Sequence, residues 1–190
     1  MFKELIIHAI AGTSPDETQS MVILKERDGE RILPIITSAR RASVLLARHQ
    51  FGMPLPFPIS PADIGCQMLH KFGIHLERVE LTNVKDGTFI CRVIAEGQGE
   101  EHVVEFCNAP DGLIMAVSAN CPIVIDEDLL EAQYLRPTGK DSYAMNINVL
   151  SRQMLEKALQ HAVDIENYEA ASRLRDELAK RTPESDKPQE

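Results

Sequence analysis

The 190-residue sequence contains no tryptophan, and aromatic residues make up only 5% of it. Its core must therefore be built from aliphatic side chains. No stretch approaches the roughly 18 apolar residues that a membrane-spanning helix requires. The short apolar run at the start is interrupted by His8, which favours a first strand over a signal peptide. We therefore expect a cytoplasmic protein that does not associate with membranes.

Positive charge is also scarce. The sequence has 20 Lys and Arg residues and 29 Asp and Glu residues, which gives a formal net charge of −9. Because proteins that coat DNA or anionic membranes need clustered cations, any contact with nucleic acid must be local or mediated by a metal ion. The four cysteines form no C-x-x-C pair, so we expect buried thiols rather than a zinc site or a disulfide framework. The sequence also lacks a P-loop, a dinucleotide fingerprint and a Ser/His/Asp signature.

The sequence does contain two successive sets of three predicted strands, each set followed by a helix. In chain order these elements are strands 3–10, 19–27 and 30–36 with helix 38–50, then strands 74–82, 88–96 and 101–107 with helix 111–120. When the two sets are aligned by sequence, Arg41 of the first corresponds to Asp111 of the second, and Ala42 corresponds to Gly112. The pattern predicts an α+β fold in which duplicated β3-α units form a mixed sheet core.

Other segments connect or follow these two units. A proline-rich stretch, 51–60, leads to a helix that begins at Ser60-Pro61 and is stopped by Gly73. His70 and His75 flank this glycine, and we do not expect a helix end and a strand start to bring them together. A strand at 122–126 and a short acidic helix at 127–133 complete the predicted domain, residues 1–134.

The C-terminal part is predicted to be an α-helical hairpin, residues 150–181, joined to the domain by a linker at 135–149 and followed by a disordered tail at 182–190. Its sequence, LEKALQHAVDIENYEAASRLRDELAK, resembles the UVR motif of excision-nuclease subunits. In that family the hairpin makes protein–protein contacts. The resemblance therefore implies a protein partner, and the candidate contact residues are Leu155, Leu159, Tyr168 and Leu174.

The domain itself resembles the bifunctional nuclease family, to which DNase and RNase activity is attributed. The resemblance rests on Leu33-Pro34-Ile35 before the first helix, on Asp111 at the start of a later helix, and on Pro122-Ile123 at the start of a strand. It implies a nuclease that hydrolyses phosphodiesters of DNA or RNA with the help of a metal ion. A homo-oligomer is a further expectation.

Within that hypothesis Asp111 is the candidate catalytic and metal-binding acid, with Mg²⁺ or Mn²⁺ as the ion, because hard cations prefer carboxylate oxygens. Glu105 is the candidate second acid, since it lies two positions before Cys107 on the same predicted strand face. The compact basic group Arg40, Arg41 and Arg48 is the candidate phosphate-binding patch.

Structural interpretations compete with each assignment. An acid in the first helical turn is favoured by the helix dipole, and arginines on an exposed helix face balance an acidic chain. The chain also departs from the family pattern: Asn108, Ala109 and Pro110 replace Arg, Pro and Ser, and Arg41 replaces a Glu. The alternative hypothesis is therefore a catalytically inactive binding or regulatory module that acts through the hairpin.

Overall fold

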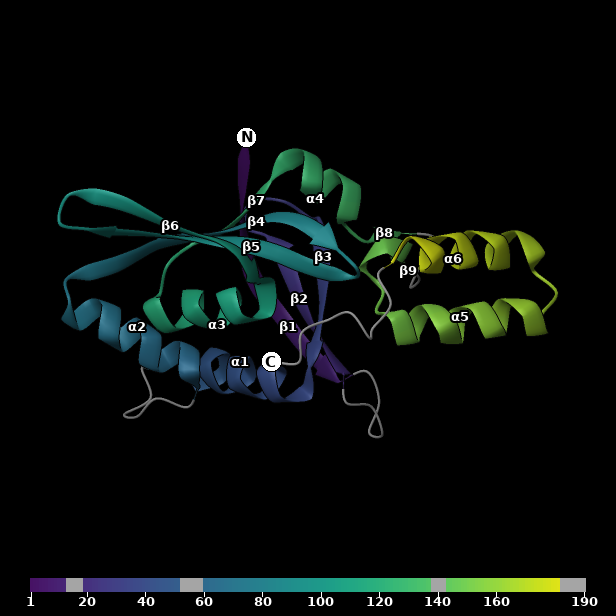
Figure 1. Cartoon of the computed structure of the whole chain (residues 1–190), viewed down its shortest axis with the longest axis horizontal. Coiled ribbons are helices and arrows are strands. Elements are labelled where there is room, and N and C mark those ends of the chain that lie inside the picture. Colours follow the sequence, from purple (N-terminus) through teal and green to yellow (C-terminus); the bar gives the residue numbers. More distant parts are fainter. Residues whose placement is uncertain (13–18, 52–59, 138–142, 182–190) are drawn as a thin grey trace.

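The computed structural model describes residues 1–12, 19–51, 60–137 and 143–181. They form a seven-stranded mixed sheet with helices on its faces and a helical pair at the C-terminal end (Figure 1). The strand order is β3-β2-β1-β7-β4-β5-β6. The predicted α+β class, with two three-stranded units and a C-terminal hairpin, is confirmed.

Each three-stranded unit is an antiparallel meander. The strands are β1 (Phe2–Gly12), β2 (Gln19–Glu26) and β3 (Ile32–Ser38) in the first unit, and β4 (Ile74–Lys85), β5 (Thr88–Gly97) and β6 (Glu100–Asn108) in the second. The short strand β7 (Ile123–Asp126) lies between them, antiparallel to β1 and parallel to β4. The two units are therefore joined into one sheet by β7.

One helix follows the third strand of each unit. These are α1 (Ala39–Phe51) and α3 (Ala109–Ala119), which pack against one face of the sheet and against each other (Figure 1). Helix α2 (Pro61–Lys71) packs against α3, and α4 (Glu127–Gln133) follows β7. The core between sheet and helices is mainly aliphatic, as predicted, and includes Val22, Leu24, Leu33, Ile35, Leu45, Leu81 and Leu113.

The C-terminal pair consists of α5 (Arg152–Asp164) and α6 (Tyr168–Lys180). Before it come the two-residue strands β8 (Arg136–Pro137) and β9 (Tyr143–Ala144) and a short 3₁₀ turn, Ile147–Val149. The pair has its own small core, formed by Leu155, Ala162, Ala171 and Leu174. The candidate contact residues Leu155 and Leu174 thus face the opposite helix, whereas Tyr168 is 68% exposed.

The base of the helical pair packs closely against the turn between β4 and β5. The Arg181 guanidinium donates hydrogen bonds to the carbonyls of Ile147, Asn148 and Leu150. Gly87 lies so close to Leu150 that a Cβ atom would collide with its carbonyl, and its φ of +77° also favours glycine. Glycine is therefore needed where the turn meets the helical pair.

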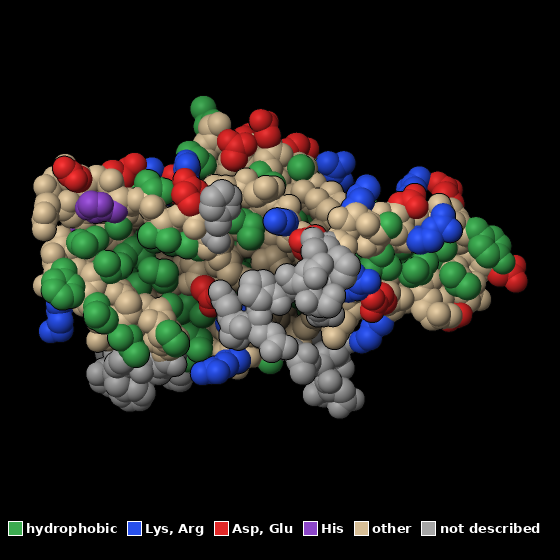
Figure 2. Space-filling model, viewed as in Figure 1, with side chains coloured by type: hydrophobic (Ala, Val, Ile, Leu, Met, Phe, Trp, Pro, Cys, Tyr) green, Lys and Arg blue, Asp and Glu red, His purple; other side chains and the backbone are tan. Residues whose placement is uncertain are grey.

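Among the described residues, the exposed apolar side chains include two groups. Ile64, Met68 and Phe72 follow one another along α2, and Val163, Ile165 and Tyr168 lie at the tip of the helical pair. Figure 2 shows apolar side chains at both of these ends of the molecule. Within the described ranges, none of the helices has the length and apolar character needed to cross a membrane.

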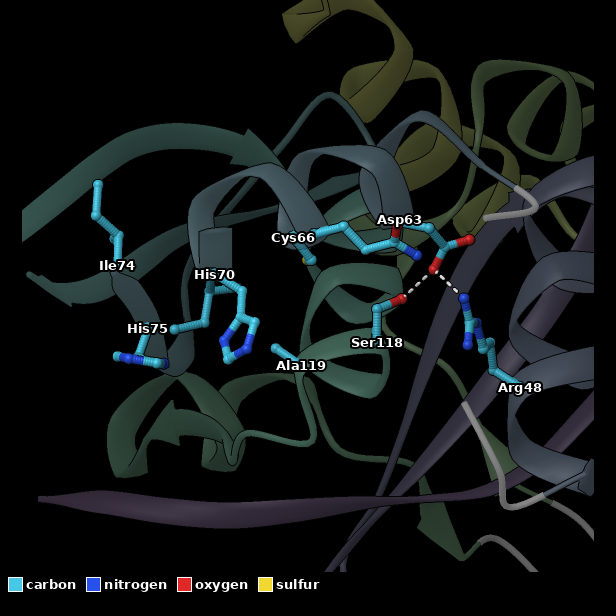
Figure 3. Close-up of a pocket in the computed structure, with 10 residues that line it drawn as sticks. Arg48, Asp63, Cys66, His70, Ile74, His75, Ser118 and Ala119 are labelled. Carbon is cyan, nitrogen blue, oxygen red and sulfur yellow. Dashed lines mark hydrogen bonds and ion pairs between the residues drawn. The ribbon is translucent and has the colours of Figure 1, made fainter. Parts of the chain in front are cut away.

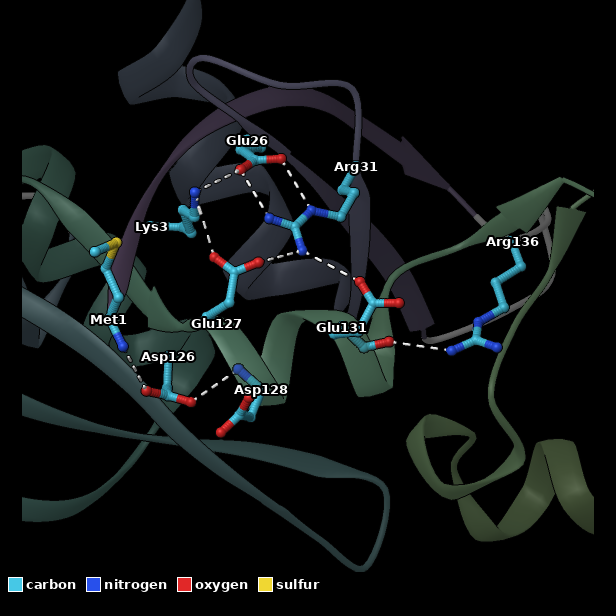
Figure 4. Close-up of polar contacts among 9 residues, drawn as sticks. All are labelled: Met1, Lys3, Glu26, Arg31, Asp126, Glu127, Asp128, Glu131 and Arg136. Atoms are coloured by element: carbon cyan, nitrogen blue, oxygen red, sulfur yellow. Dashed lines mark hydrogen bonds and ion pairs between the residues drawn. The ribbon is translucent and has the colours of Figure 1, made fainter.

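Arg31 joins the β2–β3 hairpin to α4 through a cluster of ion pairs (Figure 4). Its Nε and Nη2 donate to the two carboxylate oxygens of Glu26 at 3.0 and 2.9 Å, and its Nη1 donates to Glu127 at 2.7 Å. The hydrogen bonds from Arg31 lower the pKa of Glu26 below its ordinary value, although burial opposes the shift. The cluster therefore stabilises this edge of the domain at neutral pH.

The substitution Arg31→Met is expected to lower the free energy of unfolding at pH 7 by about 2 kcal/mol, because the mostly buried Glu26 carboxylate loses its main partner. The pKa of Glu26 is lowered in the folded state. The stabilisation that its carboxylate contributes to the fold is therefore fully present above the ordinary glutamate pKa of about 4.3. It is lost as the pH falls through the lowered folded value. The difference between variant and unmodified chain should thus shrink in acid.

Urea titrations over a pH series measure this difference. Arg27→Met is the matched control, because Arg27 pairs with Glu4 on the surface and should contribute less than about 1 kcal/mol. A loss for Arg31→Met that stays constant from pH 7 into acid would contradict the role given to Glu26.

Candidate functional site

The first turns of α1 and α3 meet beside a cleft of about 410 Å³. Five parts of the chain contribute to its walls: the start of β2, the end of β3 with the start of α1, the start of α3, the β4–β5 turn, and the base of the helical pair. The polar lining residues that matter below are Thr37, Arg41, Asp86, Asn108, Arg152 and Arg181. Asp86 belongs to the β4–β5 turn and was not among the predicted site residues.

Arg41 and Asp111 form a bidentate ion pair at this cleft. Arg41 Nε donates to Asp111 Oδ1 at 2.6 Å, and Nη2 donates to Oδ2 at 2.8 Å. The side chains are 42% and 45% exposed, so solvent reaches both. The two residues that the internal alignment placed on one another are therefore partners in space.

Both residues occupy the third position of their helices, since α1 begins at Ala39 and α3 at Ala109. A carboxylate is favoured at a helix N-terminus, but a guanidinium there is opposed by the positive end of the helix dipole. Asp111 compensates the unfavourable position of Arg41. Asp111 thus neutralises the Arg41 guanidinium, which lies between the N-termini of α1 and α3.

Two buried polar atoms of the cleft residues have no hydrogen-bond partner among the described residues. They are Thr37 Oγ1 and Asn108 Oδ1. Asn108 precedes α3 at the capping position, yet its side chain makes no capping hydrogen bond. Because a buried polar group without a partner is costly, these atoms favour a polar ligand or water in the cleft.

The three predicted phosphate-binding arginines are not in one patch. Arg40 is exposed, Arg41 binds Asp111, and Arg48 is buried nearly two turns further along α1. Arg48 Nη2 donates to Asp63 Oδ1 at 2.6 Å, so its charge is already paired inside the protein.

Asp63 is the centre of a buried network that joins three helices (Figure 3). It is 1% exposed and accepts hydrogen bonds from Arg48 on α1 and Ser118 on α3. Its backbone and side chain also form a capping box with Ser60 at the start of α2. The network borders a second pocket, of about 310 Å³, whose walls include Cys66, His70 and His75.

The cysteines are free thiols, of which Cys66 and Cys91 are buried and Cys107 and Cys121 are partly exposed. Burial raises the pKa of all four, and that of Cys91 to about 12. Their thiols therefore stay protonated at neutral pH.

A sequence model of the bifunctional nuclease domain matches residues 22–137, more than half of the chain. The chain belongs to the bifunctional nuclease family. It is also 26% identical over 129 residues to two uncharacterized proteins of Mycobacterium tuberculosis, MT1877 and Rv1829, and the match spans 67% of this chain and 75% of each relative. Membership suggests nuclease-like binding of nucleic acid, and the matched region contains the cleft pair.

Glu105 is the second candidate acid. Its Oε1 lies 3.9 Å from Nη1 of Arg92. Cys91 pairs with Cys107 and Val93 with Val104, so residues 105 and 106 both lie opposite Arg92. This bulge breaks the two-residue alternation that the prediction used to place Glu105 on the face of Cys107. The structure therefore groups Glu105 with Arg92 rather than with Asp111.

The described residues contain no group of three or more His, Cys, Asp or Glu side chains arranged to hold a metal ion. Both oxygens of Asp111 accept hydrogen bonds from Arg41. An ion at Asp111 would therefore compete with Arg41 for the charge of the same carboxylate.

The substitution Asp63→Ala is expected to lower the free energy of unfolding by about 3–5 kcal/mol, because Arg48 then remains as a buried unpaired charge. Ser60→Ala is the comparison, since it removes the cap and one hydrogen bond to Asp63 but keeps the Arg48–Asp63 pair, and it should cost about 1 kcal/mol. Denaturant unfolding measures both values. Equal, small losses would show that the buried pair does not hold the helices together.

Proposed function

We propose that this family member binds a nucleic-acid phosphate beside the first turns of α1 and α3 and hydrolyses the phosphodiester with a divalent metal ion at Asp111. The observation that carries the proposal is the bidentate Arg41–Asp111 pair in the matched domain. Arg41 is the phosphate-binding residue and Asp111 the acid that supports hydrolysis.

Arg41 can exchange one anion for another. A guanidinium presents the same fork of donors to a phosphate as to a carboxylate. Since its side chain is 42% exposed, a phosphate of a polymer can approach it from solvent. Arg40 is exposed one residue earlier, and the two helix N-termini add partial positive charge. Local positive potential thus exists on an acidic protein.

Exchange of Arg41 to the phosphate frees the Asp111 carboxylate. Mg²⁺ bound with substrate phosphates needs only one or two protein carboxylates, and Asp86 also lines the cleft. A bound Mg²⁺ or Mn²⁺ would supply an activated water and neutralise charge on the phosphate. Asp111 contributes a carboxylate oxygen, and Arg41 holds the phosphate and stabilises the charge that develops on it.

A second candidate function is binding without hydrolysis. The observation that favours it is that both Asp111 oxygens accept hydrogen bonds from Arg41, so the carboxylate already has a cationic partner. In that case the chain is a binding or regulatory module. Activity assays distinguish the two functions, because both require Arg41 but only hydrolysis requires Asp111.

The helical pair is proposed to contact a protein partner. Leu155 and Leu174 pack inside the pair, so their substitution would unfold it rather than test a contact. Leu159 is half-buried, whereas Tyr168 is exposed beside Val163 and Ile165 at the tip. The tip therefore offers an exposed apolar surface to a partner.

Asp111→Ala is expected to abolish Mg²⁺- or Mn²⁺-dependent cleavage of single-stranded or duplex substrates and to leave their binding at least as tight, because Arg41 loses its internal partner. Arg41→Met is expected to weaken binding and to reduce its salt dependence by about one phosphate contact. Fluorescence anisotropy and gel-based cleavage assays measure these effects. Arg175→Met on the exposed surface of α6 is the matched control and should change neither.

Cleavage that persists in Asp111→Ala would remove Asp111 from the site. Binding through Arg41 without cleavage by the unmodified chain, with either metal ion, would establish the binding-only function. Equal binding by Arg41→Met and the unmodified chain would exclude this cleft as the phosphate site.

A further inference from the structure

His70 and His75 lie together although they come from different elements, and the expectation that they would not converge was wrong. Their ring centroids are 5.3 Å apart, with an interplanar angle of 73°. His70 is in the last turn of α2 and His75 is the second residue of β4. Gly73 explains the approach, because its φ of +73° reverses the chain directly after the helix.

Both imidazoles are exposed, at one end of the pocket that Figure 3 shows. Among the described residues neither ring has a hydrogen bond or an ion pair, and their contact is with each other. Their nitrogens are thus available to a ligand from solvent. The Arg48 charge in the same pocket is neutralised by Asp63, so it does not repel a cation strongly.

We propose that His70 and His75 form a two-imidazole site for a borderline divalent metal ion such as Zn²⁺. Imidazole nitrogens bind Zn²⁺ at about 2.0–2.1 Å in tetrahedral geometry, which places the centres of two coordinated rings about 5 Å apart. Imidazole suits Zn²⁺ better than Mg²⁺, so this site differs in chemistry from the carboxylate cleft.

The ion has two protein ligands here, since the described residues offer no group of three suitable side chains. Water completes the coordination. Cys66 is one helical turn before His70, but its buried thiol points toward the carbonyl of Met115, at 3.8 Å. Bound Zn²⁺ would link the end of α2 to the start of β4 and stabilise the connection at Gly73.

The test is a calorimetric titration of the full chain, treated with chelator and then freed of it, with Zn²⁺ alone and with the cysteines kept reduced. Each of His70→Ala and His75→Ala should weaken Zn²⁺ binding by at least about tenfold, because each removes one of two ligands. His102→Ala is the matched control, as His102 is exposed but outside the pair, and it should keep the affinity. Zn²⁺ should also raise the melting temperature of the unmodified chain and not that of the double variant.

The proposal is overturned if the unmodified chain does not bind Zn²⁺, or if His70→Ala and His75→Ala bind it as tightly as His102→Ala does. Both histidines are on the surface, so these variants should fold. Circular dichroism of each variant verifies this before the titration.

Discussion

Strand β7 is the constraint on which the rest of the domain depends. It has only four residues, yet it pairs with β1 on one side and β4 on the other. Without it the two meanders would be separate three-stranded sheets, each with an apolar face. Its pairing joins both meanders into one continuous sheet, so that α1 and α3 pack against the same face and against each other and their first turns meet. Arg41 and Asp111 come together for this reason.

The exposure of each arginine–carboxylate pair then separates structural pairs from the pair at the cleft. Arg31 and Arg48 are held by carboxylates with low exposure, and the cost of leaving a buried charge unpaired fixes them in structural roles. Arg41 pairs with Asp111 in the bidentate geometry that Arg31 has with Glu26, but it is solvent-accessible beside two helix N-termini. The same chemistry that stabilises the interior therefore allows exchange at the cleft.

Much of the fold could be predicted from the sequence, because its signals are local. The alternating strands, the Ser60 cap and the helix end at Gly73 depend on neighbouring residues. The internal alignment of Arg41 with Asp111 treated them as equivalent positions, and both are the third residue of their helices. That the two residues bind each other could not be predicted, since it depends on the crossover that β7 creates.

The remaining differences have physical causes of the same kind. The β5–β6 bulge moved Glu105 toward Arg92, and the left-handed Gly73 brought His70 to His75. Arg48 was predicted to be on an exposed basic face because helical periodicity does not reveal the buried carboxylate of Asp63. Contacts between distant segments, rather than local propensity, determine these positions.

The most direct test of the exchange at the cleft is a crystal structure of the chain with a short phosphorothioate oligonucleotide. The proposed function predicts that the Arg41 guanidinium contacts a backbone phosphate and that the Asp111 carboxylate is released from it. An oligonucleotide bound elsewhere, with the Arg41–Asp111 pair intact, would contradict it.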